Sequence, residues 1–280
     1  MTMNIDRLRM QEADRERTSS KGNQNKWFCP PSEGSGRTGI WIKEDGLGYE
    51  ALAEILISRL LEKTNTDSFV RYRYESLQRG DQHLHGCSSH DFMEPEDDKL
   101  VSIERLFQSY RGESAAKAVL AYAEPVDRIR FVVDTVEKLT GLRQFGVYLK
   151  KILTIDAFFL NEDRHFHNLA VIQRKDGTFR ECPIFDNGAS LFSDVKGDYP
   201  LSLTFAQCRD RIQAKPFCAD FDEQMDACEI LYGGFVFRAE FTMGDVEQVL
   251  REFQGIYEPE ILERVRCVLR DQIRKYAYLF

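Results

Sequence analysis

Long apolar runs and paired cysteines are both missing from this sequence. Nowhere do about 18 consecutive apolar residues occur, the length that a membrane-spanning helix needs. Residues 1–20 are charged rather than apolar, which is unlike a signal peptide. The seven cysteines are odd in number and scattered, and no two form a C-x-x-C pair, a usage typical of reduced thiols. We therefore expect a cytoplasmic protein that does not enter a membrane.

An excess of basic residues, internal repeats and long low-complexity segments are missing as well. The net charge is −8, so no overall basic field favours nucleic acid, and we expect no direct nucleic-acid partner. Hydrophobic residues make up 42% of the chain and charged residues 30%, which indicates an ordinary globular protein. With 280 residues, the chain can bury a substantial core as one large domain or as two lobes.

The most informative feature that is present is a dense polar stretch over residues 160–192. Its polar side chains include the carboxylates of Asp163 and Asp186, the amide of Asn168 and the imidazoles of His165 and His167. Asp163 and Asn168 stand five residues apart, and Asp186 follows after eighteen more, in a run that reads Asp-Asn-Gly. This order and spacing is that of a kinase catalytic loop followed by its metal-binding aspartate.

Each of these side chains suits a task in phosphoryl transfer. Asp163 would accept or orient the proton of an attacking hydroxyl, while Asn168 would offer a neutral oxygen and Asp186 a charged oxygen to a magnesium ion. Gly188 would let the backbone turn sharply after the aspartate. A helix before the stretch and a hairpin within it would form a rigid frame for the three polar side chains.

A lysine and two glutamates upstream fit the same chemistry. Residues 38–43 read as a strand that ends in Lys43, and residues 47–63 repeat apolar side chains at helical spacing. Kinases use a strand lysine and a glutamate of the following helix to hold the α- and β-phosphates. The polar face of the predicted helix carries Glu50 and Glu54, and spacing alone does not decide between them.

The histidines of the central stretch leave other interpretations open. His165 could pack within the loop and hold Asp163 in place, or His165, His167 and Asp163 could bind a transition metal for hydrolysis. The segment could also be a surface turn whose polar residues cap neighbouring elements. A second group of possible metal ligands consists of His83, His85, Cys87 and His90. These residues could bind zinc, although imidazoles at every other position suit one face of a strand equally well.

Elsewhere the periodicity predicts a mixture of strands and helices. Further strands are expected at 27–28, at 68–74 and in a hairpin of 169–173 with 178–185. The acidic run 93–98 is expected to be a solvated loop and a boundary between lobes. Residues 1–18 are expected to form a short helix or a frayed arm. Helices are predicted at 102–110, 115–122, 125–139, 145–160, 243–253 and 258–276.

Taken together, the motifs resemble those of the HipA-like and CtkA-like bacterial kinases. The similarity rests on N-E-D-R-H-F-H-N and P-I-F-D-N-G-A-S-L-F in the central stretch. Upstream it includes S-S-K-G-N-Q-N-K-W, G-I-W-I-K, Y-E-A-L-A-E and G-C-S-S-H-D-F. The D-R-H-x-x-N and D-x-G patterns are also similar to those of phosphatidylinositol 3-kinase relatives. The similarity spans residues 19–192, and the last third matches only in its helical character.

The resemblance implies an α+β, bilobal protein-kinase-like fold with a small β-rich N-lobe and a larger, mostly helical C-lobe. The ATP-binding lobe would cover residues 1–92. The helical lobe, with the catalytic loop and the metal-binding hairpin, would cover residues 93–280. Full-length HipA toxins carry an additional N-terminal domain, for which this chain has no room, so we expect the compact type.

For the site, the resemblance implies ATP and Mg²⁺ as cofactors and a definite set of residues. The catalytic loop would contribute Asp163 as the catalytic aspartate, with His165 as its scaffold, and Asn168 and Asp186 would bind magnesium. Lys43, with Glu50 or Glu54 as its partner, would contact the nucleotide phosphates. The phosphate loop would include Gly22, Gln24 and Lys26.

The resemblance further implies a protein serine/threonine kinase whose partner is a protein substrate with a serine or threonine acceptor. Some family members phosphorylate their own phosphate loop, where Ser19 and Ser20 are the candidates here. The alternatives are a lipid or small-molecule kinase, and a pseudokinase or toxin module that acts through a partner such as an antitoxin.

Overall fold

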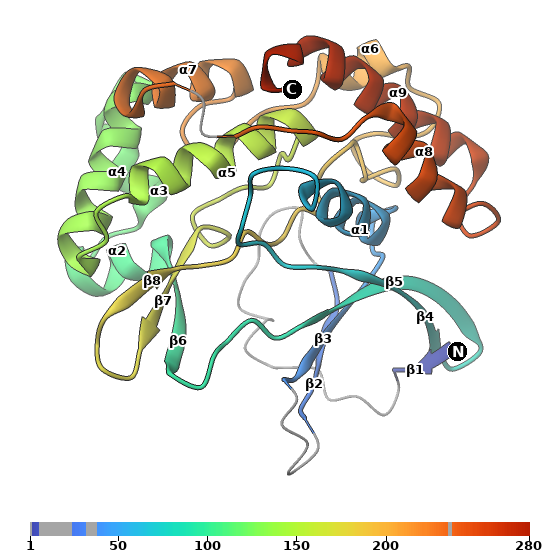
Figure 1. Ribbon diagram of the computed structural model, residues 1–280, viewed down its shortest axis with the longest axis horizontal. Coiled ribbons are helices and arrows are strands. Elements are labelled where there is room, and N and C mark those ends of the chain that lie inside the picture. The colour runs from blue at the N-terminus through green and yellow to red at the C-terminus, as the bar shows by residue number, and fades with distance from the viewer. Residues whose placement is uncertain (1, 6–23, 32–37, 235–236) are drawn as a thin grey trace.

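The computed structural model describes residues 2–5, 24–31, 38–234 and 237–280. Figure 1 shows two β-sheets along one side of the molecule and most of the helices along the other. The five-stranded sheet is strongly curved and is built from N-terminal residues, whereas the helices come mainly from the rest of the chain. The expected α+β architecture, β-rich at the N-terminus and helical towards the C-terminus, is confirmed.

The larger sheet sets two lysines side by side. Its order is β1-β4-β5-β3-β2, and all neighbouring strands are antiparallel except β1 and β4. In the β2–β3 register, Lys26 is opposite Lys43 and Trp27 is opposite Ile42. Because side chains alternate along a strand, the two lysines share the face opposite to Trp27 and Ile42. The bounds are β1 Thr2–Asn4, β2 Lys26–Cys29, β3 Ile40–Glu44, β4 Arg73–Arg79 and β5 Gln82–His90.

Helix α1 (Glu50–Leu61) follows β3 and is buried along nearly all its length. It packs against β4 and β5 and against α8 (Met243–Glu252), so its leucines and isoleucines are covered from several sides. The chain enters α1 through Gly48, where an added Cβ would lie 1.9 Å from the carbonyl oxygen of Ser193. Glycine is therefore required at this position for the close approach of the two segments.

The smaller sheet is antiparallel and joins the chain before α2 to the central stretch. Its order is β6-β7-β8, with β6 at Asp97–Ser102, β7 at Ala170–Arg174 and β8 at Phe179–Glu181. The β7–β8 hairpin turns at Gly177, whose φ of 85° favours glycine. The hairpin predicted from the Lys-Asp-Gly sequence is thus confirmed.

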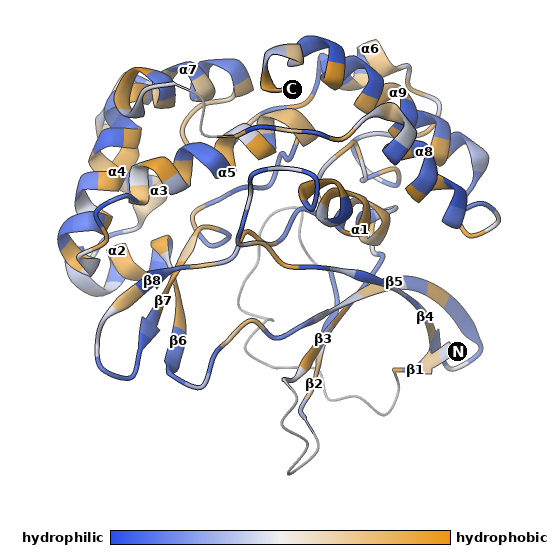
Figure 2. Ribbon diagram, in the orientation of Figure 1, coloured by the Kyte–Doolittle hydropathy of each residue, from blue (hydrophilic) through white to orange (hydrophobic). Residues whose placement is uncertain are grey.

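The helices follow the predicted periodicities closely, and within the described residues none is long and apolar enough to cross a membrane. Helix α9 buries one apolar face and carries charged residues on the other, as its mixed colouring shows (Figure 2). The remaining bounds are α2 Ile103–Arg111, α3 Ala115–Ala118, the 3-10 helix η2 Val119–Ala121, α4 Pro125–Thr140, α5 Phe145–Phe159, α6 Phe205–Arg209, α7 Phe221–Tyr232, α9 Pro259–Lys275 and the 3-10 helix η3 Ala277–Leu279.

Helix α5 is the centre of the main hydrophobic core. Its residues from Leu149 to Phe159 are nearly all buried, and α4, α7 and α9 pack against it. At its C-terminal end, Gln272 of α9 donates its amide Nε2 to the carbonyl oxygens of Ala157 and Phe158. These bonds satisfy two of the terminal carbonyl groups, and they fix the point at which the central polar stretch begins.

Two strand predictions differ from the structure. The strand predicted at 68–74 begins only at Arg73, because residues 68–70 instead pair with Ile184: Ile184 donates its N–H to Ser68 and accepts from Val70. For the same reason β8 ends at Glu181 rather than at 185, because the chain after Glu181 separates from β7 and pairs with residues 68–70. The pairing of residues 68–70 with Ile184 fixes the backbone two residues before Asp186.

The acidic run and the N-terminal segment also differ in part. Residues 93–96 form a loop as expected, but Asp97 begins β6, where Arg180 of β8 donates to its carboxylate at 2.5 Å. Thr2–Asn4 is a strand paired with β4 rather than a helix or an arm. The rest of the N-terminal segment, residues 6–18, lies outside the described residues.

Candidate active site

The catalytic loop predicted at 161–168 starts where α5 ends. Leu160 caps the helix with a left-handed backbone (φ 57°) and donates its N–H to Asp156. The turn brings Asn161 back to the helix, where its Nδ2 donates to the Asp156 carboxylate at 2.9 Å and its Oδ1 accepts the N–H of Asp163. The start of the loop is therefore fixed by the helix that precedes it.

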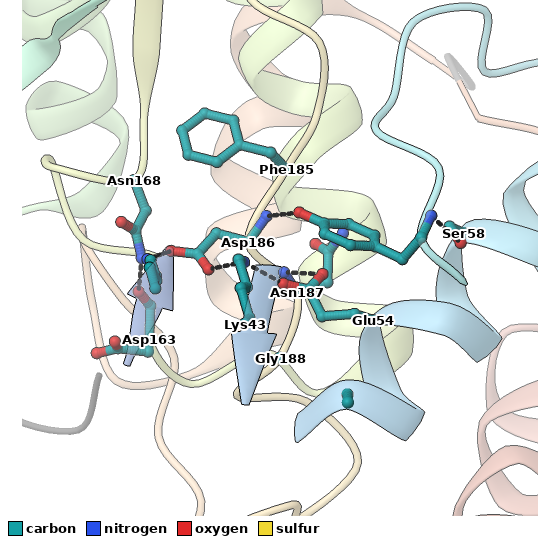
Figure 3. A network of polar contacts seen from close by, with 12 residues as sticks. Lys43, Glu54, Ser58, Asp163, Asn168, Phe185, Asp186, Asn187 and Gly188 are labelled. Carbon is teal, nitrogen blue, oxygen red and sulfur yellow. Dashed lines mark hydrogen bonds and ion pairs between the residues drawn. The ribbon is translucent and has the colours of Figure 1, made fainter. Parts of the chain in front are cut away.

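Lys43, Glu54 and Asp186 form a buried network of charges (Figure 3). The Nζ of Lys43 lies 2.5 Å from Oε1 of Glu54 and 2.7 Å from Oδ1 of Asp186. The other oxygen of Glu54 accepts the backbone N–H of Asn187 at 2.9 Å. The structure thus brings together the strand lysine, a helix glutamate and the Asp-Asn-Gly run that the sequence singled out.

The charges of this network are mutually stabilised. Burial disfavours the charged form of Lys43, but the carboxylates of Asp186 and Glu54 outweigh it and raise the lysine pKa well above its ordinary value. Burial likewise disfavours ionisation of Asp186, but Lys26 and Lys43 outweigh it and hold the aspartate pKa well below its ordinary range. Both groups are therefore charged at neutral pH.

Glu50, the alternative partner of Lys43, has a different role. Its carboxylate accepts the backbone N–H groups of Gly46, Leu47 and Gly48 at 3.3, 2.6 and 3.0 Å. Glu50 therefore stabilises the turn between β3 and α1 by accepting hydrogen bonds from its backbone, and acidic residues are favoured in the first turn of a helix. Of the two glutamates, Glu54 and not Glu50 is therefore the partner of Lys43, which corrects the pairing of Glu50 with this lysine.

Asp163 and Asn168 lie on the same tight loop. The amide Nδ2 of Asn168 donates to the backbone carbonyl of Asp163 at 3.2 Å, and the backbone N–H groups of His165 and Asn168 close two successive turns. The carboxylate of Asp163 lies 3.2 Å from Nζ of Lys215 and 3.7 Å from Nε2 of His165. His165 therefore lies directly beside Asp163.

Arg164 ties the loop to the aspartate that follows the hairpin. Its guanidinium is buried and forms an ion pair with Asp156 of α5 at 2.9 Å. It also donates to the carbonyl oxygens of Asn168 and Phe185 and, at 2.8 Å, to Oδ1 of Asn187. One side chain thus holds the loop and the Asp-Asn-Gly run in a fixed relative position. Burial raises the pKa of Asp156, and the attraction of Arg164 opposes this shift.

Unusual backbone conformations cluster around the same place. Asp186 has a φ of 62°, in the left-handed region that aspartate tolerates better than most residues. Leu191 and Phe192 adopt φ values of 59° and 60°, which are costly for large side chains. A hydrogen bond helps to hold this backbone in place, because the hydroxyl of Tyr49 donates to the carbonyl oxygen of Leu191 at 2.6 Å. Strain of this kind is often found at functional sites.

The predicted phosphate loop is described only in part. The Nζ of Lys26 lies 3.8 Å from Oδ2 of Asp186, so this lysine belongs to the site. The amide Nε2 of Gln24 is buried and has no hydrogen-bond partner among the described residues. Gly22, Ser19 and Ser20 lie outside the described residues.

The geometry does not favour the metal-binding interpretations of the histidines. Within the described ranges, no three histidine, cysteine, aspartate or glutamate side chains are grouped so as to hold a metal ion. The rings of His165 and His167 are 5.5 Å apart, edge to face. Burial lowers the pKa of His165, although the nearby Asp163 opposes this shift. In the second histidine group, His85 contacts the Tyr74 hydroxyl at 2.9 Å.

Sequence reasoning missed several residues of the site. Arg164 lies inside the recognised motif, and its burial could have been suspected from its place between two functional residues. Lys215 is 52 residues beyond Asp163, in a segment with no motif, so no local signal could have indicated it. Asp156 is the only acidic residue of α5, but it belongs to no motif that would have singled it out.

The fold itself is similar to that of a known kinase. No family model and no curated protein matches the sequence. Among solved structures, the proinflammatory kinase CtkA of Helicobacter pylori superposes with a TM-score of 0.64, covering 98% of this chain and 95% of that chain at 13% sequence identity. The chain therefore has a mixed α+β, protein-kinase-like fold.

Proposed function

We propose that this protein is an ATP- and magnesium-dependent kinase of HipA-like type that phosphorylates serine or threonine hydroxyls of proteins. The observation that carries the proposal is the network of Lys43, Glu54 and Asp186, set in a kinase-like fold beside the loop of Asp163 and Asn168. The division into an ATP-binding lobe over 1–92 and a helical lobe over 93–280, and a cytoplasmic location, belong to the same proposal.

Two lysines would bind the nucleotide phosphates. Lys26 and Lys43 are opposite each other on neighbouring strands, and both approach the carboxylate of Asp186. Two adjacent cations held by a rigid sheet suit a triphosphate. The unpartnered amide of Gln24 supports its place in the phosphate loop, because a buried donor without a partner is costly unless a ligand satisfies it.

The residues present fit a magnesium ion. Asp186 supplies an ionised carboxylate, and Asn168 directs its amide nitrogen to Asp163, an arrangement that leaves its amide oxygen for a cation. Magnesium prefers oxygen ligands, and proteins commonly hold it by one or two carboxylates while phosphates and water complete the shell. The bound ion would neutralise the charge of the phosphates.

Asp163 would act on the acceptor hydroxyl. As the hydroxyl oxygen forms a bond to the γ-phosphorus, its proton passes to the Asp163 carboxylate, and the bond from the γ-phosphorus to the bridging oxygen of ADP breaks. Lys215, 3.2 Å from this carboxylate, holds it in place and would also attract the transferred phosphoryl group. The ring of His165 lies beside the other carboxylate oxygen, with its Nε2 at 3.7 Å.

Phosphate transfer from γ-labelled ATP to a protein mixture tests the proposal. We expect the Asp163→Asn variant to lose about 10²–10⁴-fold of the wild-type rate, the usual contribution of a general base. The matched control is Asp176→Asn, in the exposed turn of the β7–β8 hairpin, which should retain full activity. The proposal fails if no protein is labelled, or if the wild type and Asp163→Asn label proteins equally.

A further inference from the structure

A pocket lies on the helical side of the catalytic loop, away from the two nucleotide lysines. Its volume is about 270 Å³, and it is lined by side chains of α2, η2, α4, the catalytic loop and the segment of Lys215. The apolar part of the lining comes from Ala116, Val119, Leu120, Phe166 and Pro216.

The pocket shares a wall with the catalytic aspartate. His165 and Lys215 both line it, and they are the two side chains that approach the carboxylate of Asp163, at 3.7 and 3.2 Å. A group that enters the pocket is therefore separated from the proposed base by one layer of side chains.

The side chain of His165, in the wall between the pocket and Asp163, lacks hydrogen-bond partners among the described residues. Both of its ring nitrogens are buried, and neither has a hydrogen-bond partner among the described residues. Buried polar atoms are normally paired, and an exception at a candidate active site indicates that a further group belongs there. In apo structures, catalytic hydrogen bonds are often incomplete until substrate binds.

The lining selects the kind of group that fits. Leu120 forms part of the rim with 72% of its surface exposed, an unusual exposure for a leucine beside a pocket. The volume lies just under the range of about 300–1,000 Å³ in which pockets bury a whole drug-sized ligand. It suits one apolar side chain better than a complete small molecule. Arg128 and Lys215 contribute positive charge to the lining, and Glu104 contributes a negative charge.

We infer that this pocket receives an apolar side chain next to the serine or threonine that is phosphorylated, so that it selects peptide substrates. The inference rests on the proposed kinase function and deepens it. The peptide places its hydroxyl at Asp163, and its apolar neighbour enters the pocket over Val119 and Leu120.

The test uses the full chain, magnesium, ATP and short synthetic peptides with one central serine. Each position flanking the serine is occupied in turn by leucine, aspartate or lysine. We expect leucine at one flanking position to raise kcat/KM at least about tenfold over aspartate, as burial of an apolar side chain does. The Leu120→Glu variant should lose this preference and favour lysine, with an unchanged KM for ATP.

Ile230→Glu is the matched control. Ile230 is as exposed as Leu120, at 74%, but it lies on α7 and does not line the pocket. This variant should keep the wild-type preference. Since both substitutions change exposed residues, a loss of folding is not expected in either.

The outcomes separate the pocket from the proposed function. Phosphorylation of peptides or of the protein itself without a flanking apolar preference would overturn the inference and leave the kinase proposal standing. So would an equal response of Leu120→Glu and Ile230→Glu. Phosphorylation of inositol-lipid vesicles and of no peptide would overturn it in favour of a lipid acceptor. A protein that transfers phosphate to nothing would overturn both.

Discussion

Lys43 is the residue on which the candidate site depends. It is buried, and it binds one carboxylate of α1 and one of the Asp-Asn-Gly run. Burying a lysine is costly unless its charge is paired, and here both partners are within hydrogen-bond distance. The position of the ammonium group is therefore fixed before any nucleotide binds, which is the condition for effective electrostatic catalysis.

The first prediction compares the two glutamates. Glu54→Gln should lower kcat/KM for ATP about 10–100-fold, because it removes a charge-assisted hydrogen bond worth roughly 1.5–3 kcal/mol to Lys43. Glu50→Gln should change kcat/KM little, since Glu50 binds the backbone of residues 46–48. Steady-state kinetics of both variants provide the measurement. Equal losses in the two would show that the Lys43–Glu54 pair has no special role.

The sequence could not choose between these glutamates for a geometric reason. Residues four apart on a helix lie within about 40° of the same direction, so Glu50 and Glu54 share one face. The choice depends on the Gly46–Leu47–Gly48 turn, which offers three N–H groups to Glu50. By contrast, the placement of Asp163 and Asn168 on one loop, and of Asp186 after the hairpin, could be predicted, because their spacing is a property of a single loop and hairpin.

Among the elements, the catalytic loop and the Asp-Asn-Gly run act as one rigid unit. They are joined by Arg164, whose guanidinium contacts α5, the loop and Asn187. The segment 68–70 holds the run from the other side through Ile184. Rigid placement by several elements is what a catalytic constellation requires.

The second prediction concerns this joint. Arg164→Ala should lower the free energy of unfolding by about 3–5 kcal/mol, since it leaves the buried carboxylate of Asp156 without its partner. Denaturant unfolding measures the change. Arg130→Ala removes an exposed ion pair with Asp127 and should cost less than about 1 kcal/mol. Similar losses in both variants would mean that Arg164 is not a structural centre.

Periodicity predicted the elements unevenly. Helices such as α4, α5 and α9 were predicted within a few residues, because their apolar residues repeat over several turns. The strand expected at 68–74 was misplaced, since its β-forming residues pair by a single bridge with Ile184. Lys215 was not predictable, because its contact with Asp163 depends on how the helical part folds back.

At the scale of the whole molecule, Asp45 connects the β-rich part to the helical part. It lies between β3 and α1, accepts the N–H of Ala51 at 2.6 Å and accepts the hydroxyl of Tyr257, ahead of α9, at 2.7 Å. Burial, with a smaller effect of Glu50, raises the pKa of Asp45 to about 8, against the lowering by these two hydrogen bonds and by Lys196. The folded protein therefore keeps Asp45 largely protonated at neutral pH.

The third prediction is a pH dependence of stability. The unfolded chain releases the Asp45 proton near its ordinary pKa, and the folded protein only near pH 8. The contribution of Asp45 is therefore complete below about pH 4 and is lost as the pH rises through 8. Between pH 5 and 8.5, the wild type should lose on the order of a few kcal/mol relative to Asp45→Asn.

Denaturant unfolding at several pH values measures this difference. Asparagine mimics the protonated carboxyl, so the Asp45→Asn curve should be flatter over this range. The control is Asp98→Asn, at an exposed position of β6, which should follow the wild type. Parallel curves for the wild type and Asp45→Asn would contradict the predicted protonation of Asp45.

The central claim is that Lys43, Asn168 and Asp186 form one phosphate- and magnesium-binding centre that faces Asp163. A crystal structure with a non-hydrolysable ATP analogue and magnesium tests it most directly. We expect the phosphates in contact with Nζ of Lys43, the metal bound by oxygens of Asn168 and Asp186, and the γ-phosphate next to Asp163. Phosphates bound away from Asp163 and Asp186 would contradict the assignment of the site.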